Sequence, residues 1–304
     1  MVFTTGARSG DDVEGLAATV TGVCPGFAVA DVLHRSPTSV LLAGEVWGEP
    51  AVAKLLLSSS PFWRETFARE IDVYRFFERH RPPFVVPKLI AADDRQPLLV
   101  LQRLDGAPVS TARYPTEEIP SRQLAAVFTA LRRVNDWRAP VGELRRVLDY
   151  RSRVERYRRS GQLTEEEYRH VTTLLNAIGD AAEFCHGNLM LPHVLRRLDG
   201  YKEGHYAMVD WAFASVFLPG FDLARLWTLL RATFGARSEI DDLVRGRGPE
   251  VWNAFLVNLA VVVAQELRTH REQPSSPERD ARLSGLEHDW LTIRDRLSLA
   301  AAAG

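Results

Sequence analysis

Short apolar runs, separated at close intervals by turn residues, constrain the first third of this 304-residue chain more than any other feature. Runs rich in Val, Leu and Ala that lie between Gly, Pro and Ser clusters are typical of β-strands. Three such runs precede a helical segment and two follow it, which predicts the order β-β-β-α-β-β within about 80 residues. The predicted strands are 27–34, 39–47, 50–57, 86–93 and 97–104.

The segment between the third and fourth predicted strands has the spacing of an amphipathic helix. Pro61 stands near its first turn, where a helix has no use for the missing N–H donor. Phe67, Ile71 and Tyr74 recur at intervals of three or four residues and would form one apolar face. We expect Pro82 to end the helix, because its ring cannot continue the backbone hydrogen bonds.

The sequence changes character after Gly106, where helical patterns replace most of the short apolar runs; the exceptions are a strand-loop segment at 183–198 and a predicted strand at 206–211. We expect residues 1–105 to form a small antiparallel β-rich lobe with one helix. Residues 106–304 would form a larger, mostly helical lobe. This is an α+β architecture with a connector near residues 103–107 and a cleft beside that connector.

Composition bears on the location of the protein. The only two cysteines, Cys24 and Cys185, have no disulfide spacing, which indicates a reducing, cytoplasmic setting. The longest apolar stretch, AFLVNLAVVVA, has about 11 residues, fewer than the roughly 20 that a membrane span needs. The formal net charge of -1 gives no electrostatic basis for binding an anionic membrane or nucleic acid. We therefore expect neither a membrane nor a nucleic-acid partner.

Lys54 is notable because only 3 of the 38 basic residues are lysine. It lies in the third predicted strand, and Glu70 falls in the helix that follows. A strand lysine and a helix glutamate in this order can form the ion pair that holds nucleotide phosphates in kinase-like sites. The alternative is a strand lysine whose side chain points to solvent.

Residues 185–227 carry the most specific pattern in the chain. In order, it reads His186-Gly187-Asn188, His193, Val209-Asp210-Trp211 and Asp222-Leu223-Ala224. This order resembles the aminoglycoside phosphotransferase and choline kinase family, whose pattern is His-Gly-Asp, Asn, Ile-Asp-Trp or Ile-Asp-Phe, and Asp-Leu-Ala. Together with Lys54 and Glu70, the resemblance covers about residues 27–230 and implies a bilobal protein kinase-like fold.

The resemblance also implies a small-molecule substrate and ATP or GTP with Mg²⁺. The residues expected to contact the nucleotide are Lys54, Glu70, Gln102 and the turn residues Ser36, Thr38 and Ser39. The catalytic loop would contribute His186 and Asn188, and Asp210 would bind the metal. Asp222 would brace that loop, and locally it could also serve as the N-cap of the helix that follows it.

Two residues depart from the family pattern. Asn188 stands where the family has its catalytic Asp, and a carboxamide cannot accept a proton at neutral pH. His193 stands where the family has a metal-binding Asn, and Mg²⁺ prefers oxygen ligands to an imidazole nitrogen. General-base assistance is typically worth about 10²–10⁴-fold. We therefore expect a diverged, pseudokinase-like protein with weakened or repurposed phosphotransfer.

One alternative keeps the enzyme active. An ATP- or GTP-dependent O-phosphotransferase would use His193 with Asp210 to hold the metal and Asn188 only to orient the acceptor hydroxyl. A transition-metal site is a second alternative, because Cys185, His186, His193, His205 and Asp210 cluster in the sequence. Their spacing matches no recognised zinc motif.

A third alternative is a non-catalytic scaffold or binding protein. Residues 144–162 are rich in arginine, and Arg151, Arg153 and Arg156 would bind an anionic partner. A solvated helix face explains the same composition.

Overall fold

The computed structural model describes residues 10–144, 146–197 and 206–303. They fall into two compact units. The first takes in the described residues within Met1–Arg113, Ala126–Val134 and Leu191–Ala214; the second takes in those within Tyr114–Ala125, Asn135–Met190 and Ser215–Gly304. The expected lobe boundary between residues 105 and 106 stays a prediction.

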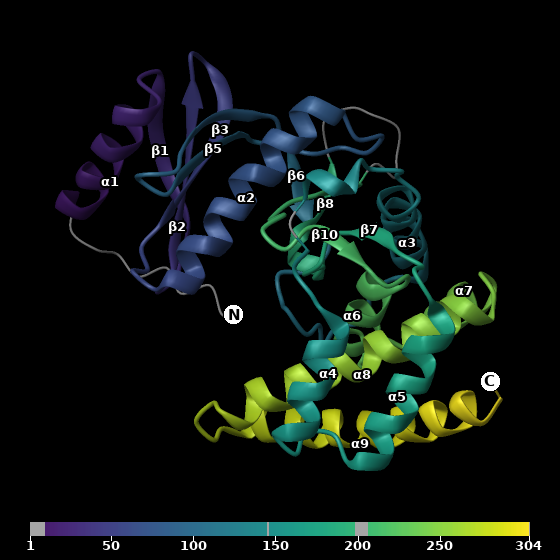
Figure 1. The fold of residues 1–304 in the computed structure, drawn as a ribbon. Helices are drawn as coiled ribbons and strands as arrows, with labels where there is room; N and C mark the ends of the chain where they lie inside the picture. Colours follow the sequence, from purple (N-terminus) through teal and green to yellow (C-terminus); the bar gives the residue numbers. More distant parts are fainter. Residues whose placement is uncertain (1–9, 145, 198–205, 304) are drawn as a thin grey trace. The chain divides into compact units, whose positions relative to one another are not determined.

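A five-stranded antiparallel sheet forms the centre of the first unit, with the strand order β1-β2-β3-β5-β4 (Figure 1). The predicted order of three strands, one helix and two strands is confirmed. The elements are α1 (Gly10–Val23), β1 (Phe27–Arg35), β2 (Ser39–Val46), β3 (Glu49–Leu56), α2 (Pro61–His80), β4 (Leu89–Asp93) and β5 (Leu98–Gln102).

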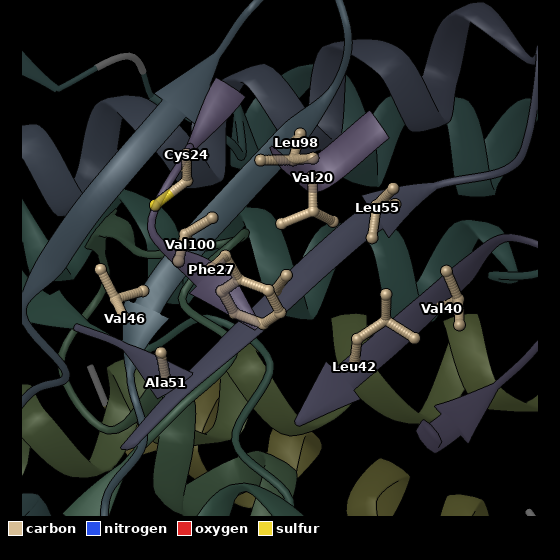
Figure 2. Close-up of a cluster of buried hydrophobic side chains, with 11 residues drawn as sticks. Val20, Cys24, Phe27, Val40, Leu42, Val46, Ala51, Leu55, Leu98 and Val100 are labelled. Atoms are coloured by element: carbon tan, nitrogen blue, oxygen red, sulfur yellow. The ribbon is translucent and has the colours of Figure 1, made fainter. Parts of the chain in front are cut away.

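The two faces of this sheet are covered by different helices. Alternate residues of β3, including Ala51 and Leu55, belong with Val20 of α1 to one buried apolar cluster (Figure 2). Successive side chains of a strand point to opposite faces, so Lys54 points away from that cluster. Its partner there is Glu70 of α2. One face of β3 thus contributes to an apolar core, and the other face carries the charged residue Lys54.

Helix α2 buries the apolar face that its spacing predicts. Phe67, Ile71 and Tyr74 are each at most 3% exposed. The helix ends at His80, and Arg81 adopts a left-handed conformation with its N–H bonded to the carbonyl of Phe77. This is a common way to close a helix before a proline.

A second, three-stranded sheet lies in the same unit, in the order β6-β8-β9. Its strands are β6 (Gly106–Pro108), β8 (Val194–Arg197) and β9 (Tyr206–Met208). Ala126–Val134 of α3 (Ser121–Asn135) also belong to this unit. Val194 pairs with Met208, and the N–H of Val209 donates to the carbonyl of His193 at 3.0 Å. This pairing brings the residues before β8 and after β9 together.

The second unit is mostly helical, with one two-stranded sheet formed by β7 and β10. Helices α5, α8 and α9 pack against one another in this unit (Figure 1). The elements are the 3₁₀-helix η1 (Val141–Glu143), α4 (Tyr150–Arg159), α5 (Glu165–Ile178), β7 (Glu183–Cys185), β10 (Ser215–Phe217), α6 (Phe221–Leu229), α7 (Ala236–Arg245), α8 (Pro249–Arg271) and α9 (Pro277–Ala303). A further 3₁₀ turn, η2 (Leu191–His193), precedes β8 in the first unit.

Helix α8 is long and apolar enough to cross a membrane by length and composition, but 72% of its most apolar stretch is buried inside the protein. Its one polar residue in the apolar run, Asn258, is fully satisfied there. Asn258 accepts from the Tyr150 hydroxyl at 2.6 Å and donates to the carbonyls of Leu218 and Pro219. These bonds fit the predicted buried helix.

Gly44 offers a test of how tightly β1 and β2 pack. A Cβ at this position would lie 2.3 Å from the carbonyl oxygen of Ala28 and 2.7 Å from the ring of Phe27. Backbone atoms cannot yield cheaply, so Gly44→Ala should lower the free energy of unfolding by about 1–3 kcal/mol in urea titrations.

The matched control is Gly15→Ala. Gly15 lies exposed in α1 with no atom within 4 Å of the added Cβ. This change should raise stability by about 0.5–1 kcal/mol, because alanine favours the helix. Equal effects of the two substitutions would contradict the close approach at Gly44.

Candidate functional site

Lys54 is the centre of a charged site in the first unit. Its Nζ lies 2.7 Å from Oε2 of Glu70 and 2.9 Å from Oδ1 of Asp210. Glu70 is only 2% exposed, whereas Asp210 keeps 36% of its side chain exposed. The predicted ion pair between strand and helix is therefore present, and a third residue, 156 positions from Lys54, joins it.

Asp210 is presented by an unusual backbone. Its φ is 66°, in the left-handed region that few residues other than glycine, asparagine and aspartate adopt. The strand expected over 206–211 accordingly ends at Met208. The second carboxylate oxygen of Asp210, Oδ2, lies 3.3 Å from Nε2 of His193. Lys54, Glu70, Asp210 and His193 thus converge.

The electrostatics of this group follow from burial and charge. Burial raises the pKa of Glu70 to about 7; Lys54 opposes the shift and Asp210 adds to it. Burial by itself lowers the pKa of Lys54, but the carboxylates of Asp210 and Glu70 outweigh it, so the pKa is raised. Lys54 therefore stays charged and stabilises the two carboxylates beside it.

The turn between β1 and β2 carries the three hydroxyls that the sequence singles out. The Ser36 hydroxyl accepts from the backbone N–H groups of Thr38 at 3.2 Å and Ser39 at 3.0 Å. Ser39 pairs with Leu56, two residues beyond Lys54 on β3. Gln102 ends β5 opposite Ala51, and its backbone N–H donates to the carbonyl of Lys88. Their expected contacts with a nucleotide stay predictions.

The loop after β7 belongs to the second unit and is held by one carboxylate. Asp222 accepts from the N–H of His186 at 2.7 Å and from the N–H of Gly187 at 3.0 Å. Burial raises its pKa to about 7, although these backbone bonds lower it. Asp222 therefore braces the loop, as the resemblance implies. The alternative role as N-cap is wrong, because Gly220 holds that position.

Asn188, in the same loop, contacts a cation that sequence reasoning missed. Nη2 of Arg225 donates to Oδ1 of Asn188 at 2.9 Å, and Nη1 donates to Oε1 of Glu266 at 3.0 Å. Arginine only donates hydrogen bonds, so the carboxamide oxygen of Asn188 must be the atom that faces Arg225. The remaining polar group of Asn188, its Nδ2 amide, can donate a hydrogen bond but cannot accept a proton.

Two further side chains extend this network within the second unit. The Tyr114 hydroxyl donates to Oε2 of Glu266, and Nε2 of His270 lies 2.8 Å from the same hydroxyl. Glu266 and Arg225 interrupt apolar helices and are at most 6% exposed. An isolated charge in an apolar helix is a sequence signal for such a pair, because buried charges need partners.

The remaining predicted sites are less organised. Arg151 donates to Asn176, and Arg153 donates to the Tyr157 hydroxyl, so an anionic partner at the arginine-rich helix stays a prediction. No group of three His, Cys, Asp or Glu side chains suited to a metal occurs among the described residues. His205, part of the zinc or iron alternative, lies outside them.

Comparison with known proteins places this geometry in a wider group. The family model described as "Phosphotransferase enzyme family" matches residues 36–255. No curated protein matches the sequence.

Several solved structures share the fold. A putative aminoglycoside phosphotransferase from Ralstonia eutropha has a TM-score of 0.58 at 14% identity, covering 96% of this chain and 98% of its own. The GDP complex of wild-type aminoglycoside 2'-phosphotransferase-IIIa has a TM-score of 0.55 at 12% identity, with coverages of 95% and 98%. A mutant of aminoglycoside phosphotransferase APH(4)-Ia bound to ADP and hygromycin B has a TM-score of 0.55 at 14% identity, with coverages of 96% and 99%. The expected kinase-like fold is confirmed.

The buried charges at Lys54 predict a pH-dependent defect. In Lys54→Met, Glu70 would remain buried beside Asp210 without a cation, which should lower the free energy of unfolding by about 3–5 kcal/mol at pH 8. Without Lys54, the pKa of Glu70 rises above its present value of about 7, while the unfolded value stays near 4.5. A raised native pKa means that stability is retained at low pH and lost as pH rises through it.

The loss in Lys54→Met should therefore shrink between pH 8 and pH 5, as urea titrations at each pH would reveal. The control is Lys54→Met/Glu70→Gln, whose deficit relative to the wild type should vary much less over the same range. A deficit in the single variant that grows as the pH falls would refute the arrangement.

Proposed function

The chain belongs to the phosphotransferase enzyme family, and we propose that it binds ATP or GTP with Mg²⁺ and a small molecule but transfers phosphate weakly. The proposal of weak transfer rests on the Asn188 carboxamide, whose oxygen accepts a hydrogen bond from Arg225. The proposal that a nucleotide and a small-molecule acceptor bind rests on the charged site at Lys54 and on the family.

Support for nucleotide binding comes from the geometry of Lys54. Its ammonium is held between two carboxylates, and the exposed part of Asp210 lies beside it. Nucleotide phosphates are bound in kinase-like sites by a lysine that pairs with a helix glutamate. Two of the solved structures with this fold contain ADP or GDP.

A metal ion would be held at this site mainly by the carboxylate of Asp210. Mg²⁺ is usually bound by one or two carboxylates together with substrate phosphates, and Asp210 offers such a carboxylate with 36% of its side chain exposed. His193 adds a nitrogen, which suits Mn²⁺ or softer cations better than Mg²⁺. When bound, the ion would neutralise charge on the phosphates.

Transfer depends on the loop in the second unit. A catalytic aspartate would accept the proton of the acceptor hydroxyl, whereas Asn188 presents a donor beside the Arg225 cation. Phosphoryl transfer relies mainly on positioning and electrostatics, so loss of the base lowers the rate without abolishing the reaction. We therefore propose that phosphoryl transfer is slow rather than absent.

The acceptor we propose is a small molecule, because the APH(4)-Ia complex contains hygromycin B. We also propose a cytoplasmic location, since Cys24 and Cys185 are both free and buried. The chemical identity of the acceptor is a separate question from the weak transfer.

Nucleotide binding is tested by calorimetry with ATP and GTP in Mg²⁺ or Mn²⁺. Asp210→Asn should weaken metal-dependent binding at least tenfold, because it removes the carboxylate while asparagine tolerates the left-handed backbone. His193→Asn should strengthen binding with Mg²⁺ relative to Mn²⁺, since it replaces a nitrogen ligand with an oxygen.

The control is Asp241→Asn, a carboxylate that pairs with Arg296 in the second unit. It should leave nucleotide affinity unchanged. Failure of both nucleotides to bind with either metal would overturn the proposed nucleotide site.

The weakness of transfer is tested by restoring the family's residue. Asn188→Asp should raise nucleotide turnover by about 10²-fold, with water or hygromycin B as acceptor, because it returns a proton acceptor to the loop. The Arg225 cation would keep the pKa of that carboxylate low. Asn176→Asp, at an exposed position of α5, is the matched control. Rapid wild-type turnover that survives Asn188→Ala would show that transfer is not weakened.

A further inference from the structure

A pocket lies in the first unit, and none of the residues assigned to the nucleotide lines it. Its volume is about 530 Å³, within the range of small-molecule sites. The walls come from the loop after α2, from α3 and from β9. The lining residues are Pro83, Phe84, Val85, Ala126, Thr129, Ala130, Arg133, Val134, Tyr206 and Met208.

The chemistry of the walls defines what the pocket would take. Most lining side chains are apolar, and the aromatic ring of Phe84 contributes a flat surface. The polar lining groups are the hydroxyls of Thr129 and Tyr206 and the guanidinium of Arg133, all of which can donate hydrogen bonds. Arg133 is exposed and is the one ionisable cation in the lining. This combination favours one anionic head on an apolar body.

We infer that this pocket binds a small aromatic monocarboxylate. The carboxylate would accept from Arg133 in the two-pronged geometry that arginine favours, and the ring would lie against Phe84. A doubly charged phosphate ester fits less well, because the lining offers a single arginine for its two negative charges.

The pocket is connected to the nucleotide site through Trp211. This fully buried ring stacks on Phe84, with centroids 5.5 Å apart and 22° between the planes. Its Nε1 donates to the carbonyl of Met208 at 2.9 Å. Phe84 and Met208 both line the pocket, and Trp211 directly follows Asp210. A ligand in the pocket would therefore change the surroundings of Trp211, the residue next to the proposed metal ligand Asp210.

The test uses 2-naphthoate as the probe and titration calorimetry on the full chain. A ligand of this size should bind with a Kd on the order of 1 mM or tighter. The neutral isostere 2-naphthylmethanol should bind roughly tenfold more weakly, because it lacks the charge that Arg133 recognises. Equal affinity for the alcohol would overturn the assignment to a carboxylate.

Two variants locate the probe. Arg133→Gln, at an exposed position that should fold normally, should remove the preference for the carboxylate, while Arg132→Gln on the same helix should not. Ala130→Trp should fill the pocket and abolish binding. Binding that is unchanged in both Arg133→Gln and Ala130→Trp would place the probe elsewhere and overturn the inference.

The connection to Trp211 is measured without nucleotide. In protein labelled with 5-fluorotryptophan, the Trp211 resonance, assigned with Trp211→Phe, should shift on titration with 2-naphthoate. The signals of Trp227 and Trp252 in the second unit serve as internal controls. Absence of both heat and a Trp211 shift up to roughly 10 mM would overturn the inference, whatever the outcome for nucleotide.

Discussion

The first unit depends on one partly buried ammonium group that pairs with two carboxylates. Lys54 lies on the polar face of the sheet, and Glu70 is almost wholly removed from water beside it. A buried charge without a partner would cost several kcal/mol, so sheet, helix and the turn at Asp210 must meet at one point. This requirement fixes the position of α2 and of the residues after β9 within the unit.

In the second unit, too, a buried charge is paired with an opposite charge, and the same cation also orients a loop residue. Arg225 and Glu266 are a buried pair, and the cation keeps one arm for Asn188. Asp222 holds the backbone of the loop while Arg225 holds its side chain. Asp222 and Arg225 therefore brace the loop, yet the carboxamide of Asn188 cannot accept a proton. The loop is therefore held in place by hydrogen bonds although its residue 188 cannot act as a general base.

Much of the first unit could be predicted because its information is local. Turn residues between short apolar runs indicated the five strands, and helical spacing indicated α2 with its buried Phe67 and Tyr74. The pairing of Lys54 with Glu70 followed from their order in strand and helix. The length of β9 was overestimated, because nothing in the run 206–211 shows that Asp210 turns into a left-handed conformation.

The sequence by itself determined the order of elements, the apolar faces, and the residue types at positions 54, 70, 188, 193 and 210. Only the tertiary structure decided that Asp210 shares Lys54 with Glu70, and that Asn188 is oriented by Arg225. The physical reason is the distance along the chain over which each kind of interaction acts. Periodicity and turn chemistry act over a few residues, whereas the Arg225–Asn188 hydrogen bond and the Lys54–Asp210 ion pair join side chains that are 37 and 156 positions apart.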